Sequence, residues 1–95
     1  MATSEARVAT TRGTRYMSQL LKHFSHKTEA EWTDERGSVT FADLGTCTLV
    51  VEPEALVLRA ESANDEGLGR VEQVVGGHLV RFATRDELTV SWTRT

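Results

Sequence analysis

The sequence has one cysteine, one proline and no long hydrophobic run, and each scarcity excludes a class of protein. The single thiol of Cys47 cannot form a disulfide within the chain. The segment from Met1 to Arg12 lacks the apolar stretch of about 7–15 residues that an export signal needs, and Glu5 interrupts the acid-free pattern of an organelle transit peptide. No apolar run approaches the roughly 20 residues of a membrane-spanning helix. We therefore expect a protein of the reducing cytoplasm with no membrane association.

An excess of positive charge is also missing. Eleven Lys and Arg stand against 14 Asp and Glu, a net charge of −3, so the chain lacks the electrostatic footprint of a general nucleic-acid binder. The proportions of hydrophobic residues (39%) and charged residues (26%) are typical of a globular chain. We expect one domain over residues 1–95, with a thin core that dimerisation could supplement.

Hydrophobic periodicity predicts two helices. In residues 14–25, apolar side chains share one helical face: Tyr16, Met17, Leu20, Leu21 and Phe24. A second stripe runs through residues 64–82, behind a segment of N-cap residues: Leu68, Val71, Val75, Leu79 and Phe82. The second helix also contains Gly67, Gly69, Gly76 and Gly77, each of which lowers helix propensity by about 1 kcal/mol. Its stability must therefore depend on tertiary packing, and the glycines could let another backbone approach closely.

Alternating apolar and polar residues predict six short strands, at 6–9, 29–32, 38–41, 46–51, 55–60 and 88–93. The four central strands are joined by tight turns, one of them at Pro53, so they form an antiparallel meander. The predicted class is α+β, in the order β-α-β-β-β-β-α-β, with an antiparallel β-sheet and two α-helices packed on one face. This order is similar in topology to half of a TATA-binding-protein-like fold.

Three histidines are the main candidates for a site. His23 and His26 form an H-x-x-H pair at the end of the first helix, and His78 lies beside the stripe of the second. If both helices cover the same sheet face, His78 could approach His23, and the three imidazoles could bind a transition metal or haem. Alternatively, the histidines simply pack at the edge of the core, and H-x-x-H lacks the spacing of a zinc hydrolase motif.

The remaining candidates each have a structural alternative. Lys22, Lys27, Arg81 and Arg85 could hold an anionic ligand, but cations near helix C-termini also stabilise helices. Cys47 could be a nucleophile paired with a histidine, but its place among apolar strand residues favours a core role. The ends of two predicted strands carry Trp32 and Trp92 on the core side, where packing is favoured over ligand stacking.

Two histidine-containing segments, Lys22-His23-Phe24-Ser25-His26-Lys27 and Gly77-His78-Leu79-Val80-Arg81-Phe82-Ala83, occur with Gly45-Thr46-Cys47 and Glu87-Leu88-Thr89-Val90-Ser91-Trp92. In this order and spacing, from about Glu5 to Trp92, they resemble the bacterial family catalogued as domain of unknown function 2218. The family has no established activity. The resemblance implies a small stand-alone cytoplasmic protein and directs interest to six residues: His23, His26, Lys27, Cys47, His78 and Arg81. Some relatives resemble domains joined to, or encoded beside, flavin-dependent siderophore-interacting reductases, which implies a link to iron uptake by analogy.

These observations lead to three functional hypotheses. The first is a non-enzymatic binding or accessory domain of iron or siderophore handling, in which His23, His26 and His78 supply ligands while Lys27 and Arg81 contact an anionic group. The second is a small enzyme that uses Cys47 with a histidine base, or a metal-activated water. The third is a structural module that forms a homodimer, in which the histidines only pack.

Overall fold

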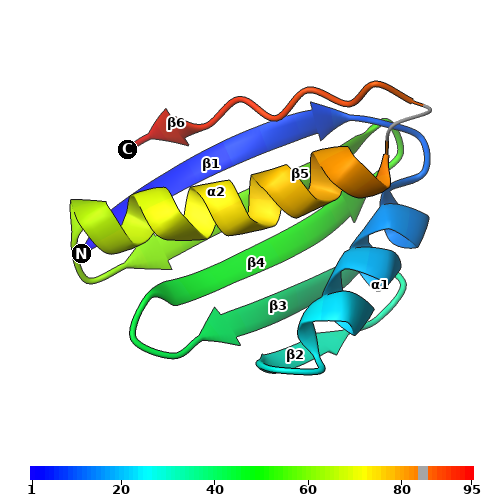
Figure 1. The fold of residues 1–95 in the computed structure, drawn as a ribbon. Helices are drawn as coiled ribbons and strands as arrows, with labels where there is room; N and C mark the ends of the chain where they lie inside the picture. Colours follow the sequence, from blue (N-terminus) through cyan, green and yellow to red (C-terminus); the bar gives the residue numbers. More distant parts are fainter. Residues whose placement is uncertain (84–85) are drawn as a thin grey trace.

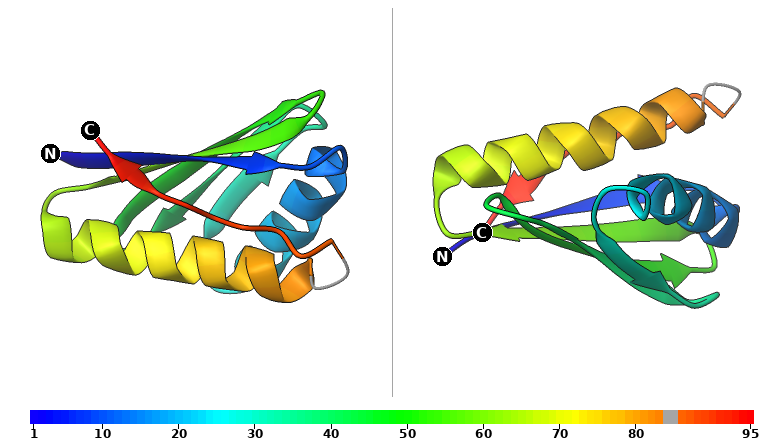
Figure 2. Two further views of the ribbon diagram at one scale, coloured as in Figure 1. Left: turned by 90° about the horizontal axis from the view of Figure 1, so that it is seen from above. Right: turned by 60° about the horizontal axis from the view of Figure 1, so that its bottom comes forward.

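The computed structural model describes residues 1–83 and 86–95 as a single sheet with two helices on one of its faces (Figure 1, Figure 2). In chain order the elements are β1 (Ala2–Ala9), α1 (Gly13–Phe24), β2 (Glu29–Trp32), β3 (Arg36–Phe41), β4 (Gly45–Glu52), β5 (Ala55–Ser62), α2 (Asp65–Phe82) and β6 (Thr93–Arg94). All strand pairs are antiparallel, and the spatial order is β2-β3-β4-β5-β1-β6. The predicted fold class and element order are confirmed.

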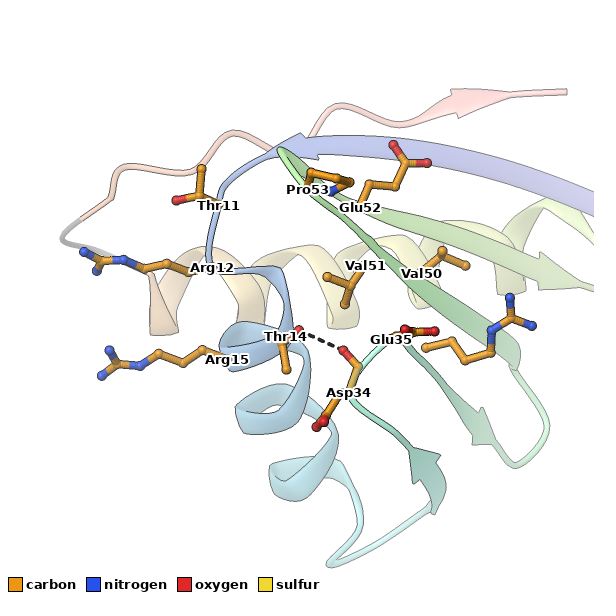
Figure 3. A pocket seen from close by; sticks show the side chains of 11 residues that line it. Thr11, Arg12, Thr14, Arg15, Asp34, Glu35, Val50, Val51, Glu52 and Pro53 are labelled. Carbon is orange, nitrogen blue, oxygen red and sulfur yellow. Dashed lines mark hydrogen bonds between the residues drawn. The ribbon is translucent and has the colours of Figure 1, made fainter.

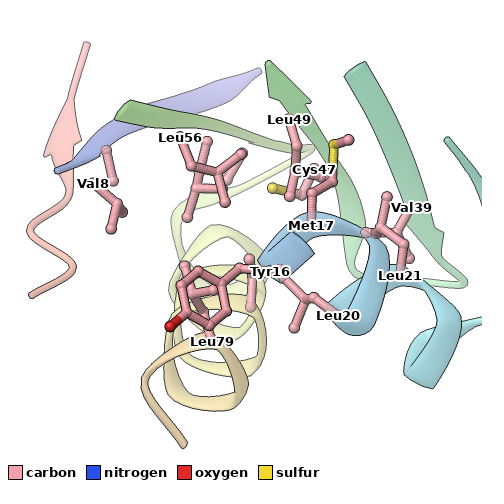
Figure 4. Packing of buried hydrophobic residues seen from close by; sticks show 14 of the residues in the cluster. Val8, Tyr16, Met17, Leu20, Leu21, Val39, Cys47, Leu49, Leu56 and Leu79 are labelled. Carbon is pink, nitrogen blue, oxygen red and sulfur yellow. The ribbon is translucent and has the colours of Figure 1, made fainter. Parts of the chain in front are cut away.

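The core lies between the sheet and the two helices (Figure 4). All five apolar residues predicted for the first helix are buried, as are four of the five in the second, with Phe82 half-buried. They meet the inward-facing residues of the strands, among them Val8, Val39, Leu49 and Leu56. Because strand side chains alternate between faces, the other face of the sheet carries mostly polar residues and stays uncovered by either helix (Figure 2).

The closing strand was predicted at 88–93, and this prediction is wrong in extent. Only Thr93 and Arg94 pair with β1. The expected alternation of burial holds, since Leu88 is buried and Thr89 exposed. Residues 88–92 nevertheless form no strand, and their apolar side chains pack against α2 where Gly76 leaves room for Val90 and Trp92. We name residues 86–95 the C-terminal arm.

Other boundaries differ less. The first strand begins at Ala2 rather than Ala6, because the inward-facing Ser4 hides the apolar alternation although it is buried. The first helix occupies Gly13–Phe24, one residue earlier than predicted at each end. The second begins one residue later than predicted, behind Asn64, whose side chain accepts a hydrogen bond from the Gly67 amide.

Close backbone approach, predicted for the glycines of the second helix, occurs at Gly67. A β-carbon there would lie 2.9 Å from the Leu44 carbonyl oxygen. The first residue of β4 must also be glycine, because Gly45 has φ +153° and a β-carbon would overlap the Glu61 carbonyl oxygen of β5. The packing of α2 therefore depends on Gly67, and the close approach of β4 to β5 depends on Gly45.

Side-chain contacts with the two helices hold both ends of the C-terminal arm. The Tyr16 hydroxyl of α1 donates to the Asp86 carboxylate, and Arg12 Nη1 lies 3.7 Å from the same carboxylate oxygen. At the far end, Arg94 Nη2 lies 3.2 Å from Glu72 Oε1 of α2.

In the part of the chain that the structure describes, neither helix is both long and apolar enough to cross a bilayer.

Candidate functional site

Two of the three candidate histidines meet across the two helices. His23 lies in the last turn of α1 and His78 lies in α2. Their ring centroids are 5.2 Å apart and the ring planes are inclined by 36°. The His23 side chain is exposed and that of His78 is half-buried, so the pair is accessible from solvent. The predicted approach of His78 to His23 is therefore what the packing of both helices on one face produces.

A backbone hydrogen bond orients the second imidazole. His78 Nδ1 lies 2.7 Å from the Val74 carbonyl oxygen, one helical turn earlier. A carbonyl can only accept, so Nδ1 carries the proton and donates. In the neutral ring, Nε2 is then left with a free lone pair. Metal-binding histidines in proteins are commonly held by such a bond from the other ring nitrogen.

Two phenylalanine rings, Phe24 and Phe82, pack against the histidine pair. Phe24, buried at the end of α1, lies 5.2 Å from His78 and 5.2 Å from Phe41 of β3, measured between ring centroids. The Phe82 and His23 ring centroids are 5.5 Å apart, with the ring planes inclined by 73°. Edge-to-face contacts of this kind stabilise aromatic pairs beyond their area burial. We name His23, His78 and Phe82 the histidine site.

His26 and Lys27 lie outside the histidine site. Both follow the end of α1 and are exposed in the turn that the Lys27 amide closes on the Phe24 carbonyl. His26 takes no part in the ring contacts that join His23 to His78. Among residues 1–83 and 86–95, no three His, Cys, Asp or Glu side chains gather as a metal site would require. The predicted set of three histidine ligands is therefore not assembled.

Three of the predicted cations lie close in sequence to the two histidines of the site. Lys22, Lys27 and Arg81 are exposed, and within the described ranges none of them forms an ion pair. Arg85, the fourth predicted cation, lies outside the described residues. These three cations lie near the C-terminal ends of the two helices, as their positions in the sequence predict.

Cys47 is a core residue, as its sequence context favoured. Its side chain is fully buried on the inward face of β4. Burial raises the pKa of the Cys47 thiol to about 12. A nucleophilic cysteine instead requires a lowered pKa and access to solvent. Trp32 and Trp92 are likewise packed against the core, each half-buried.

The sequence interpretation missed a large open cleft at the start of α1 (Figure 3). It has a volume of about 1020 Å³ and lies between α1, the β2–β3 turn and the β4–β5 turn. Thr14 Oγ1 donates to the Asp34 carbonyl oxygen at 2.8 Å across it. Only the run of arginines at Arg12 and Arg15 could have indicated this place. The cleft contains none of the candidate site residues, its walls mix both signs of charge, and its lining includes no aromatic or imidazole ring and no buried polar residue. The histidine site therefore remains the better candidate.

Comparison with known proteins supports the fold and the family. The chain is similar to the protein PA4090 from Pseudomonas aeruginosa, known from an NMR structure, with a TM-score of 0.82 and 34% sequence identity. The similarity covers 98% of this chain and 96% of that one. No curated protein matches the sequence. A family described as an uncharacterised protein conserved in bacteria matches residues 5–93. The chain therefore belongs to this bacterial family, domain of unknown function 2218.

Proposed function

We propose that this chain is a non-enzymatic binding domain of bacterial iron or siderophore handling, which takes an anionic iron chelate at the histidine site. The observation that carries the proposal is the His23–His78 pair, whose centroids lie 5.2 Å apart at an exposed junction of two helices. A siderophore-interacting flavin reductase is the proposed protein that acts on the same chelate.

The donor set fits a chelate better than a bare ion. Imidazole nitrogens suit iron, zinc and copper, and a metal about 2.1 Å from each of two ring nitrogens is compatible with the observed ring spacing. Two ligands do not complete a coordination sphere, and no third protein donor joins them in the described part of the chain. The oxygen atoms of a chelator would supply the remaining ligands.

The surrounding charge supports an anionic ligand. Lys22 directly precedes His23 on α1, Arg81 follows His78 by three residues on α2, and Lys27 lies in the turn after α1; all three are exposed. Lysine ammonium and arginine guanidinium groups bind carboxylates through charge-assisted hydrogen bonds. Phe82, half-buried beside His23, offers an apolar surface on which the organic part of a chelate could rest.

The enzyme alternative has less support. A Cys–His mechanism needs an accessible thiolate, whereas Cys47 is fully buried with a raised pKa. A metal-activated water needs a protein-held metal, for which two histidines are a sparse ligand set. The dimer alternative rests on no particular contact of the described residues.

The test is an NMR titration of the three imidazoles with Zn²⁺, ferric citrate and haem, each added separately. We expect saturable shifts at His23 and His78 with micromolar ferric citrate, and weaker ones with Zn²⁺. His23→Ala and His78→Gln should abolish them. His26→Ala is the matched control, since it removes an exposed imidazole nearby without touching the pair. Equal losses in all three variants, or unshifted rings throughout, would overturn the proposal.

A further inference from the structure

The outer face of α1 carries only one sign of charge. Residues 6–28 contain five Lys and Arg and no Asp or Glu, whereas the remainder has six Lys and Arg against 14 acids, a net charge of −8. Along α1 and the residues flanking it, the exposed side chains recur with helical spacing opposite the core: Arg12, Arg15, Gln19, Lys22, His23 and His26. We name this stripe the cationic face.

The charges at the start of this stripe, Arg12 and Arg15, work against the helix that carries them, whereas Lys22 and His23 lie in its last turn, where a cation is favourable. The N-terminus of a helix has a partial positive charge, so a cation in the first turn is unfavourable there and a carboxylate favourable. The first turn of α1 has no acidic residue, and Arg12 provides no side-chain cap. By contrast, α2 begins with the Asn64 cap and two acidic residues. A local rule of helix stability that is broken without a local gain indicates a functional constraint.

Few of these charges are neutralised within the chain. Arg12 approaches Asp86 at 3.7 Å. Arg15 and Lys22 are exposed and form no ion pair in residues 1–83 and 86–95. A merely solvated helix surface mixes both signs, because alternating charges at i and i+4 are stabilising. On α1 itself the cationic face has no such mixture, and the nearest carboxylates, Asp34, Glu35 and Glu52, lie on the other walls of the cleft that Arg12 and Arg15 line.

We propose that the cationic face is a docking surface for an acidic protein surface. The proposal goes beyond the iron-binding function, because it concerns a protein partner and depends on Arg15, which lies outside the histidine site. A single face of a three-turn helix is smaller than the roughly 800 Å² per partner of a stable interface. The complex is therefore transient, guided by charge, and sensitive to salt.

Other polyanionic partners fit less well. A nucleic acid would extend beyond this short stripe and meet the net negative charge of the rest of the chain. A membrane-binding helix inserts an apolar face, but the apolar face of α1 is buried against the sheet. The large exposed hydrophobic residues of the described chain are Met1, Val50 and Val80, none of them on α1.

The test uses the intact protein and a helical peptide of the length of α1 that repeats Glu-Glu-Ala-Glu. We expect amide shifts confined to α1 and the adjoining turn, and a dissociation constant that rises about tenfold between about 50 and 300 mM salt. The key variant is Arg15→Glu. It should abolish binding and at the same time raise the thermal midpoint, because it places a carboxylate in the first turn.

Arg59→Glu is the matched control, since it makes the same charge change on the uncovered face of the sheet. The affinity of this variant for the peptide should stay within about twofold of the wild-type value, as expected of a charge remote from the interface. Equal weakening by both variants, or shifts over the open sheet face, would overturn the proposal. So would tighter binding to anionic vesicles or duplex DNA than to the peptide, or self-association that Arg15→Glu removes. Because His78→Gln leaves every residue of the cationic face in place, loss of chelate binding with intact peptide binding in that variant separates this proposal from the proposed function.

Discussion

The glycines of α2 allow a sharp test of the packing, because neighbouring positions should respond with opposite signs. Gly77 is exposed, and a β-carbon placed there meets no atom within 4 Å. Gly77→Ala therefore gains helix propensity without a clash, about 0.8–1.0 kcal/mol. For a domain of this size, that corresponds to a thermal midpoint higher by about 4–8 °C.

Gly67→Ala should have the reverse effect. Its β-carbon would overlap Ser62 Oγ and lie 2.9 Å from the Leu44 carbonyl oxygen, a backbone atom that cannot easily move. The Ser62 hydroxyl also donates to that carbonyl, so displacing it forfeits a hydrogen bond of about 1 kcal/mol. Overpacking typically costs about 1–3 kcal/mol, which outweighs the gain in propensity. We expect a net destabilisation of about 1–3 kcal/mol.

Gly76→Ala lies between these cases and reports on the C-terminal arm. The added carbon would be 3.1 Å from Trp92 Nε1 and 3.3 Å from Val90 Cγ1, so the arm must shift slightly. Urea unfolding followed by tryptophan fluorescence measures all three variants. The order of stability should be Gly77→Ala above wild type, with Gly67→Ala lowest. If Gly67→Ala and Gly77→Ala were equally stabilising, α2 would not pack on the Leu44 turn as described.

Three further predictions concern the single residues Cys47, Tyr16 and Gly45. Cys47 should resist alkylation in the folded protein and react only on unfolding, because burial raises its pKa to about 12; fast alkylation of the native state would contradict this. Tyr16 is the only tyrosine, so ultraviolet titration reads it directly, and the hydrogen bond to Asp86 should hold its pKa above the ordinary 10.0. The stability contributed by this bond is complete below pH 10 and lost as pH rises through the folded pKa, and Asp86→Asn should lower the midpoint. Gly45→Ala should destabilise by several kcal/mol, since its carbon overlaps the Glu61 carbonyl at positive φ; a thermal midpoint near wild type would refute that geometry.

Much of the fold could be predicted because its elements have strong local patterns. Helix α1 has an uninterrupted apolar face from Tyr16 to Phe24, and tight turns between the central strands leave only antiparallel pairing. The closing strand could not be delimited in this way. Val90 and Trp92 alternate like strand residues, but they pack at Gly76 of α2 instead of extending the ladder on β1. Alternation predicts which side chains are buried, but it does not show whether the segment pairs with a neighbouring strand.

The candidate site was only half predictable for a similar reason. His23 and His26 are three residues apart in sequence, and a helix of full length would have kept them on neighbouring faces. Because α1 ends at Phe24, His26 falls in the turn and leaves the pair. The cleft at the start of α1 combines three segments distant in sequence, so no local pattern except that of Arg12 and Arg15 could have indicated it.

By itself, then, the sequence determined the α+β class, the faces of both helices, the core position of Cys47 and the uneven distribution of charge along the chain. These properties depend on residue type and on spacing within one element, which local physics governs. Only the tertiary structure decided that His23 meets His78 while His26 stands apart, that the arm follows α2, and which glycines are indispensable. Each of these depends on the position where one element crosses another, and that position is set by close packing of the whole core.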